Sequence, residues 1–167
     1  MHTVVRIQPL TKAAFAKFGD VIECEESEFF PINDGHTQRY HALSTIQCEG
    51  EGSSVGITIF RNVITTDLPL KISMLERHPY GSQSFIPMAR QKFLIIVALA
   101  SNADQPDEQH IYAFESNGLQ GVTYAKGVWH HPLLSYESPS DFLVVDRISG
   151  GENCDVYQLS SPCVINY

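Results

Sequence analysis

The chain has few of the positive charges that nucleic-acid-binding proteins use. Lysine and arginine together number 11, aspartate and glutamate number 19, and the net charge is −8. Because binding to a phosphate backbone requires clustered cations, this composition argues against a nucleic-acid partner. It leaves room for a small anionic substrate, since a few placed cations inside a pocket are enough to bind one.

Long apolar runs are also missing. The longest, at 93–100, is far too short to span a bilayer. The first residues, MHTVVRIQPL, do not show a charged segment followed by an apolar core, the pattern of a signal peptide. We therefore expect no membrane association and a cytoplasmic location.

Cysteines are few and scattered. None forms a CxxC pair, and no cysteine–histidine spacing resembles that of a zinc knuckle. We expect them to be reduced thiols with structural roles, as is usual in cytoplasmic proteins. The four are Cys24, Cys48, Cys154 and Cys163.

The length of 167 residues favours a single domain over 1–167, and an apolar content of 43% is that of an ordinary globular protein. One short helix is predicted near the N-terminus. Thr11 can cap it, Phe15 and Phe18 form an apolar stripe, and Gly19 can end it.

After that helix the sequence consists of short β-type segments separated by glycine, proline and polar turns. The segment 92–100 is apolar throughout, which predicts a strand buried on both faces. The polar segment 102–108 is predicted to be a loop. Many short strands with regular punctuation predict an all-β fold, a double-sheet β-barrel or jelly roll. The other predicted strands are 54–60, 70–78, 110–116, 140–148 and a last strand after the Gly-rich turn that begins at 149.

A group of polar residues follows the predicted strand 70–78. Glu76 and His78 are two residues apart, so on a strand both side chains point to the same face. Gln83 follows across a short turn. Farther along the chain, His130 lies three residues after Gly127, on a segment that leaves a second tight turn.

The spacing of these residues resembles the two cupin motifs, H-x-H-x4-E and P-x-G-x2-H. The first corresponds to Glu76-x-His78-x4-Gln83, and the second to residues 125–130, ending at His130. The resemblance implies a cupin-like double-stranded β-barrel in which Glu76, His78, Gln83 and His130 bind a divalent metal. Three residue types differ from the motifs, and an amide oxygen is a weak, neutral ligand.

Five longer blocks resemble the ureidoglycolate lyase (ureidoglycolate hydrolase) family. This resemblance implies a cupin-like homodimer that cleaves (S)-ureidoglycolate to glyoxylate and urea in allantoin and purine catabolism, and it associates Ni²⁺ with the site. The blocks are 32–41, 76–88, 117–133, 141–147 and 152–156.

The chemistry of that reaction is compatible with the residues present. Ureidoglycolate is a hemiaminal, so breaking its C–N bond needs a base for the hydroxyl proton and an acid for the departing nitrogen. Glu76, His78 and His130 are the predicted catalytic residues. Arg61 and Lys126 are predicted to bind the substrate carboxylate, and Gln83 is a further substrate-binding candidate.

Several alternatives stay open at this point. His131 competes with His130, because neighbours on a strand point to opposite faces. Arg61 and Lys126 are equally compatible with surface ion pairs or solvation. Only one of Asp146 and Arg147 can face inward.

The function also has alternatives: another metal-dependent cupin enzyme, such as an isomerase or dioxygenase, or a non-catalytic cupin that binds a small organic acid. The sequence does not say whether or which metal binds, or which group is the base. It also does not separate urea release from hydrolysis to ammonia.

Overall fold

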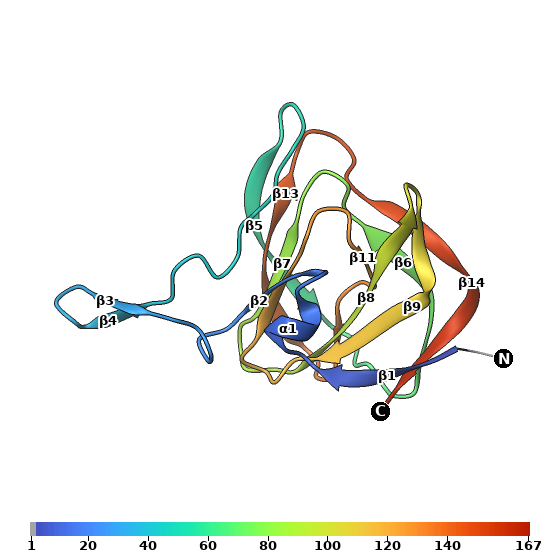
Figure 1. Cartoon of the computed structure of the whole chain (residues 1–167), viewed down its shortest axis with the longest axis horizontal. Helices are drawn as coiled ribbons and strands as arrows, with labels where there is room; N and C mark the ends of the chain where they lie inside the picture. Colours follow the sequence, from blue (N-terminus) through green and yellow to red (C-terminus); the bar gives the residue numbers. More distant parts are fainter. Residues whose placement is uncertain (1–2) are drawn as a thin grey trace.

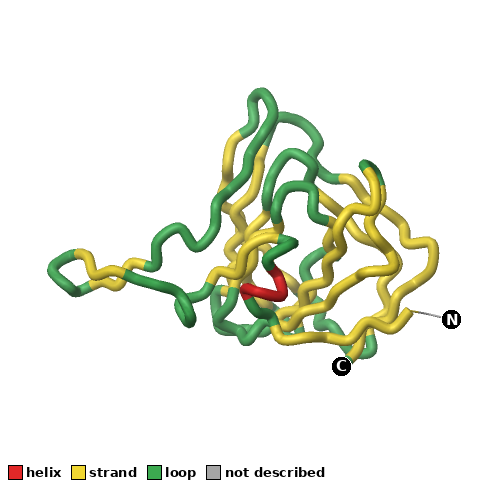
Figure 2. Tube along the Cα trace, viewed as in Figure 1, coloured by secondary structure: helices red, strands yellow, loops and turns green. Residues whose placement is uncertain are grey.

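The computed structural model describes residues 3–167 and consists almost entirely of β-strands (Figures 1 and 2). The predicted all-β, cupin-like barrel with a short N-terminal helix is confirmed. No helix among the described residues is long and apolar enough to cross a membrane. The elements are β1 (Thr3–Pro9), α1 (Lys12–Phe15), β2 (Gly19–Ile22), β3 (Phe30–Ile32), β4 (Thr37–Arg39), β5 (Ser54–Asn62), β6 (Leu70–Arg77), β7 (Gln83–Pro87), β8 (Phe93–Asn102), β9 (Gln105–Glu115), β10 (Gly121–Tyr124), β11 (Trp129–His130), β12 (Leu134–Ser135), β13 (Ser140–Ile148) and β14 (Asp155–Asn166).

Six strands close into a barrel. Hydrogen-bonded neighbours run in the order β6, β14, β1, β9, β8 and β11, and β11 pairs back onto β6. The short strand β11 therefore closes the ring, because it pairs with β8 on one side and with β6 on the other. Closure removes the open edges that would otherwise expose unpaired backbone groups.

A second sheet, in the order β2-β10-β7-β13-β5, packs against the barrel. Strand β8 shows how the two are joined. Leu94 and Ile96 belong to the core cluster inside the barrel, whereas Phe93 and Ile95 belong to the cluster shared with the second sheet. Because alternate side chains point to opposite faces, one strand contributes to both cores. The predicted burial of this strand on both faces is confirmed for 93–98.

Helix α1 is shorter than the segment predicted to hold it. Thr11 caps it through Oγ1, which accepts a hydrogen bond from the Ala14 backbone N–H at 3.2 Å. Phe15 and Phe18 are fully buried. Gly19 begins the next strand with φ +147, and a Cβ there would lie 1.8 Å from the Thr123 carbonyl oxygen, so this close approach requires glycine.

Two loop regions differ from the sequence prediction. Residues 105–108 belong to β9, because β8 and β9 form a hairpin that turns at 103–104. Strands β3 and β4 were not predicted. They form a two-stranded arm, residues 30–39, that projects from the body on the side of β5 (Figures 1 and 2).

Candidate active site

Three titratable side chains meet where the barrel faces the second sheet. Glu76 lies near the end of β6, His78 follows that strand, and His130 lies on β11. One ligand atom from each residue lies within 4.8 Å of the others. We refer to Glu76, His78 and His130 as the triad.

Strand pairing accounts for this convergence. His130 and Glu76 are direct Cα partners between β11 and β6. Leu75 and Trp129, their neighbours in sequence, pack in the core inside the barrel. Alternation therefore directs Glu76 and His130 outward, to the side of the second sheet.

His130 is held as a neutral imidazole. Its Nδ1–H donates to the Val128 carbonyl at 2.9 Å, and its ring stacks on Tyr124 with 4.3 Å between centroids. Burial, reinforced by nearby His78, lowers the pKa of His130 to about 3. Its Nε2 has no hydrogen-bond partner among residues 3–167 and lies 3.7 Å from Glu76 Oε1. The buried lone pair of His130 Nε2 is thus directed at the Glu76 carboxylate. A cation would be expected between these two groups.

His78 joins the triad to the second sheet. Its Nδ1–H donates to the Asn153 carbonyl at 2.7 Å, which directs Nε2 at Gln83 Oε1, 3.1 Å away. The Gln83 amide in turn donates to Asp146 Oδ2 at 3.0 Å. The site therefore includes a chain of polar contacts that runs from β6 through β7 to β13.

Glu76 is a half-buried carboxylate. Burial raises its pKa, an effect that nearby His78 and the Cys154 thiol partly oppose. The Cys154 S–H donates to Glu76 Oε2 at 3.9 Å. A carboxylate with a raised pKa accepts a proton more readily than one in water, and this property suits a general base.

The triad fits a divalent metal ion. Each histidine donates its Nδ1–H to a backbone carbonyl, the arrangement that orients metal-binding histidines, and directs Nε2 at the site. His130 Nε2 is buried without a partner beside the carboxylate. Two imidazoles and a carboxylate suit several first-row metals, including nickel and zinc. Gln83 Oε1 lies 3.1 Å from His78 Nε2 and is therefore adjacent to the triad.

Two cavities flank the triad. One of about 250 Å³ is lined by His78, Ser82, Asp146, Arg147, Ser149, Gly151, Asn153 and Cys154. We call it the His78 cavity. The other, of about 340 Å³, is lined by Phe60, Arg61, Asn62, Glu76, Gln83, Phe85, Pro132 and Leu133. We call it the Glu76 cavity. The contact between His78 Nε2 and Gln83 Oε1 lies at the boundary between them.

Both cations that were predicted to bind the substrate carboxylate are already paired with carboxylates of the protein. Arg61 lines the Glu76 cavity, but its guanidinium forms a bidentate pair with Asp141 at 2.7 and 2.8 Å. Phe60 packs inward on Phe85, so Arg61 points to the outer face of the sheet. The Lys126 ammonium pairs with Glu49 and lines neither cavity.

The alternation question at 130 and 131 has a clear structural answer. His131 lies outside the triad, and its Nδ1–H donates to the Pro132 carbonyl at 2.9 Å. Alternation also left open which of Asp146 and Arg147 faces inward. Asp146 faces Gln83. Arg147 lies on the opposite side of β13, but near the end of the strand it also lines the His78 cavity.

Sequence reasoning assigned no role to four residues that border the triad. Two of them, Asn153 and Cys154, lie in a block of family resemblance, which was the only signal available for them. Tyr124 and Asp146 also lie in such blocks, but their contacts arise from packing between strands far apart in the sequence.

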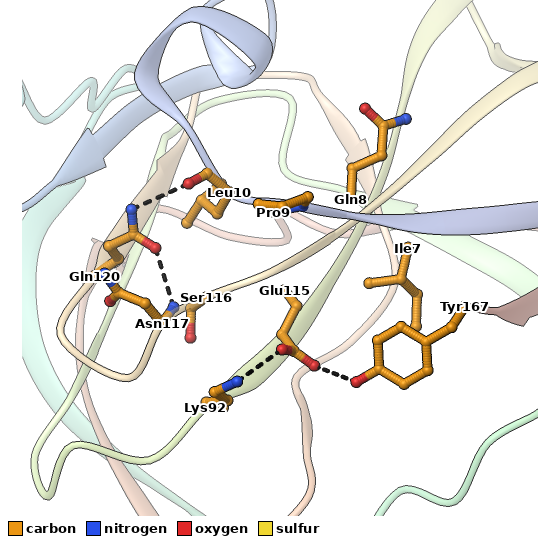
Figure 3. A pocket seen from close by; sticks show the side chains of 10 residues that line it. All are labelled: Ile7, Gln8, Pro9, Leu10, Lys92, Glu115, Ser116, Asn117, Gln120 and Tyr167. Atoms are coloured by element: carbon orange, nitrogen blue, oxygen red, sulfur yellow. Dashed lines mark hydrogen bonds and ion pairs between the residues drawn. The ribbon is translucent and has the colours of Figure 1, made fainter.

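A larger cavity lies elsewhere. It measures about 470 Å³ and is lined by residues of β1, β9 and the segments around them, none of which belongs to the triad (Figure 3). Its charged groups are already paired: Lys92 donates to Glu115 at 3.0 Å, and Tyr167 donates to the same carboxylate. Size alone therefore does not identify the site, because the reactive groups are beside the smaller cavities.

Comparison with known proteins identifies the family of the chain. A family model described as "Ureidoglycolate lyase" matches residues 2–166. The chain belongs to the ureidoglycolate lyase family. A protein of Stutzerimonas stutzeri named ureidoglycolate lyase is 52% identical over 151 residues, which cover 90% of this chain and 87% of that protein. Relatives of the same name from Pseudomonas putida and Pseudomonas paraeruginosa are 52% and 51% identical, and cover 93% and 90% of this chain and 90% and 88% of their own lengths. The family resemblance noted in the sequence is confirmed.

Proposed function

We propose that this protein cleaves (S)-ureidoglycolate to glyoxylate and urea. The observation that carries the proposal is the family match over residues 2–166, and the triad is compatible with it. Relatives that share about half of their residues along nine-tenths of this chain carry the name of that activity.

The cleavage redistributes one proton and consumes no water. The hydroxyl proton of the hemiaminal leaves, the C–O bond becomes a carbonyl, and the C–N electron pair leaves with the urea nitrogen, which takes up a proton. In the protein without a bound metal, we propose Glu76 as the base, because burial raises its pKa and it lines a cavity. His78 and His130 complete the proton-transfer and binding groups beside it.

We further propose that Glu76, His78 and His130 hold a divalent metal, with Gln83 as a weak fourth ligand or as a substrate contact. The family resemblance suggests Ni²⁺. When bound, such an ion lowers the pKa of a hydroxyl and orients the oxygen atoms of a substrate. The two Nδ1–H hydrogen bonds to backbone carbonyls support this proposal, because they hold both imidazoles in the tautomer that a metal requires.

Arg61 and Lys126 remain proposals as substrate-binding residues. Each would have to leave its present carboxylate, Asp141 or Glu49, in order to contact a substrate. Exposed ion pairs generally contribute little to stability, so exchange of partners is energetically accessible.

We propose that the protein is a homodimer that meets its second copy through the outer face of the second sheet. Ile57 and Ile59 on the edge strand β5 share that face and are 74% and 57% exposed. The arm of residues 30–39 projects on the same side, and its strands pair only with each other (Figure 1). An isolated hairpin is marginally stable in water, so a second copy that covers the arm and the sheet would stabilise both.

We also propose a cytoplasmic location. All four cysteines are free thiols, and Cys24 and Cys154 are exposed, as suits a reducing compartment.

Product analysis with (S)-ureidoglycolate tests the activity. Glyoxylate and urea are expected in equal amounts, above the spontaneous decomposition of the hemiaminal, which must be subtracted as a blank. Release of ammonia in place of urea would identify hydrolysis. No rate above the blank, with or without added nickel, would exclude the lyase.

A further inference from the structure

Arg147 is a buried cation without a carboxylate partner. Arg147 lies near the end of β13, and the residue is 8% exposed. Nε donates to the Glu49 carbonyl at 2.8 Å, and the two terminal nitrogens donate to the carbonyls of Gly150 and Gly151 at 2.7 and 3.2 Å. Among residues 3–167 no aspartate or glutamate oxygen comes within ion-pairing distance of this guanidinium.

Other arginines in the protein are compensated differently. Arg61 pairs with Asp141, and Arg77 pairs with Asp155 at 2.8 Å. Arg147 is more buried than either, but its contacts are three backbone carbonyls and the ring of Tyr80, whose centroid lies 5.6 Å from Cζ. Removing a charge from water is costly unless an opposite charge or enough hydrogen bonds replace the lost hydration. Three of the five N–H groups of Arg147 have partners, so two are free to donate to an anion.

The position of Arg147 connects these two remaining N–H donors to the active site. Arg147 and His78 line the same cavity of about 250 Å³, together with Ser82 and Asn153. That cavity is large enough for a small organic acid and carries hydroxyl and amide groups as further donors. Asp146 also lines it, but one of its carboxylate oxygens already accepts from Gln83.

We infer that the His78 cavity is a carboxylate-binding subsite and that Arg147 is the residue that recognises the anion. The inference rests on the proposed lyase function for the identity of the substrate, but the chemistry extends to small 2-oxo and 2-hydroxy acids in general. A carboxylate bound at Arg147 places the adjacent carbon on the side of His78. In ureidoglycolate that carbon carries the hydroxyl and the urea nitrogen, so the anion contact would position the reacting carbon beside the triad.

A purely structural role is the competing explanation. Through the same guanidinium, Arg147 ties the segment at Glu49 to the turn at Gly150 and Gly151. The test must therefore separate loss of anion binding from loss of folding. Arg147→Met removes the charge and keeps much of the volume, whereas Arg147→Lys keeps a point charge without the forked donors. Arg6→Met is the control for loss of an arginine charge, since Arg6 is exposed on β1 and lines neither cavity.

In the experiment, oxamate is titrated into the metal-free full chain and binding is measured by calorimetry. Oxamate is a small anion in which a carboxylate is joined to a neutral amide. Circular dichroism and thermal unfolding of every variant are recorded in parallel. We expect Arg147→Met to weaken oxamate binding at least about 10-fold and Arg147→Lys by a smaller factor, whereas Arg6→Met leaves the affinity within about twofold. With ureidoglycolate, Arg147→Lys should raise KM more than it lowers kcat.

Three results would overturn the inference. These are a folded Arg147→Met with wild-type oxamate affinity, an equal loss in Arg6→Met, or no oxamate binding by the wild-type chain. If Arg147→Met does not fold, Arg147→Lys decides, because wild-type affinity in that variant excludes recognition by the forked donors. Oxamate binding that depends on Arg147, in a protein without lyase activity, would support the subsite and contradict the proposed function.

Discussion

His130 and Glu76 are direct cross-strand partners, and their Nε2 and Oε1 atoms lie 3.7 Å apart. The pair joins β11 to β6 at the position where β11 closes the barrel. Barrel closure and assembly of the site are therefore the same structural event. His78, two residues beyond Glu76, completes the triad from the end of the same strand.

Replacing either triad histidine should abolish most of the activity. We expect His78→Ala and His130→Ala to lower kcat by about 10²–10⁴-fold, the range typical of lost proton-transfer groups. Glyoxylate formation above the blank is the measurement. His131→Ala is the matched control and should keep most of the activity, because His131 lies outside the triad. Equal losses at 130 and 131 would contradict the assignment.

Metal binding should depend on the triad. Wild-type protein equilibrated with Ni²⁺ and then desalted is expected to retain about one ion per chain, as a site of two imidazoles and a carboxylate would. Elemental analysis gives the content. His130→Asn should weaken binding at least about 10-fold. Cys154→Ser, which alters a neighbour of Glu76 without removing a triad member, should retain the ion. Retention of nickel by His130→Asn would place the ion elsewhere.

The stability of the metal-free protein should fall as the pH falls below 6.5. Burial lowers the pKa of His130 to about 3, so between these two values the unfolded chain binds a proton that the native protein does not. The free energy of unfolding then decreases by up to about 1.4 kcal/mol per pH unit from this residue.

Urea unfolding between pH 7.5 and 4.5 measures this dependence. His130→Asn lacks the titrating group and should show a shallower decline. Parallel curves for the two proteins would mean that His130 does not contribute.

The exposed sheet face should determine the oligomeric state. Ile57→Asp places a charge on the face where we propose that two copies meet, so it should convert a dimer to a monomer. Light scattering after gel filtration reports the mass relative to the chain mass of 18.7 kDa. Val156→Asp is the matched control, because Val156 is similarly exposed, at 56%, but lies on β14 of the barrel. A wild-type monomer would exclude the proposal.

Much of the fold could be predicted from local patterns. The segment 140–148 was predicted as a strand with the bounds that β13 has, and the apolar run at 92–100 largely matches β8. Local patterns were less reliable where polar residues occur in strands. The start of β9 was predicted as a loop, because its hairpin with β8 is stabilised by pairing that composition does not reveal.

The candidate site could be predicted in part. Spacing alone placed Glu76 and His78 on one face, and motif spacing preferred His130 to His131. The ion pairing of Arg61 and Lys126 could not be predicted, because it depends on carboxylates that are distant in sequence. Asp141 pairs with Arg61, and Glu49 pairs with Lys126.

By itself, the sequence determined the strand alternation, the turns and the spacing that carries the family resemblance, since these depend on near neighbours along the chain. Only the tertiary structure decided which distant residues meet. Closure of the barrel brings His130 to Glu76 across 54 positions of sequence, from 76 to 130. Packing of the turn at 150–151 around β13 leaves Arg147 buried without a counter-ion. The physical reason is that hydrogen-bond pairing and burial are long-range properties, which a local pattern does not specify.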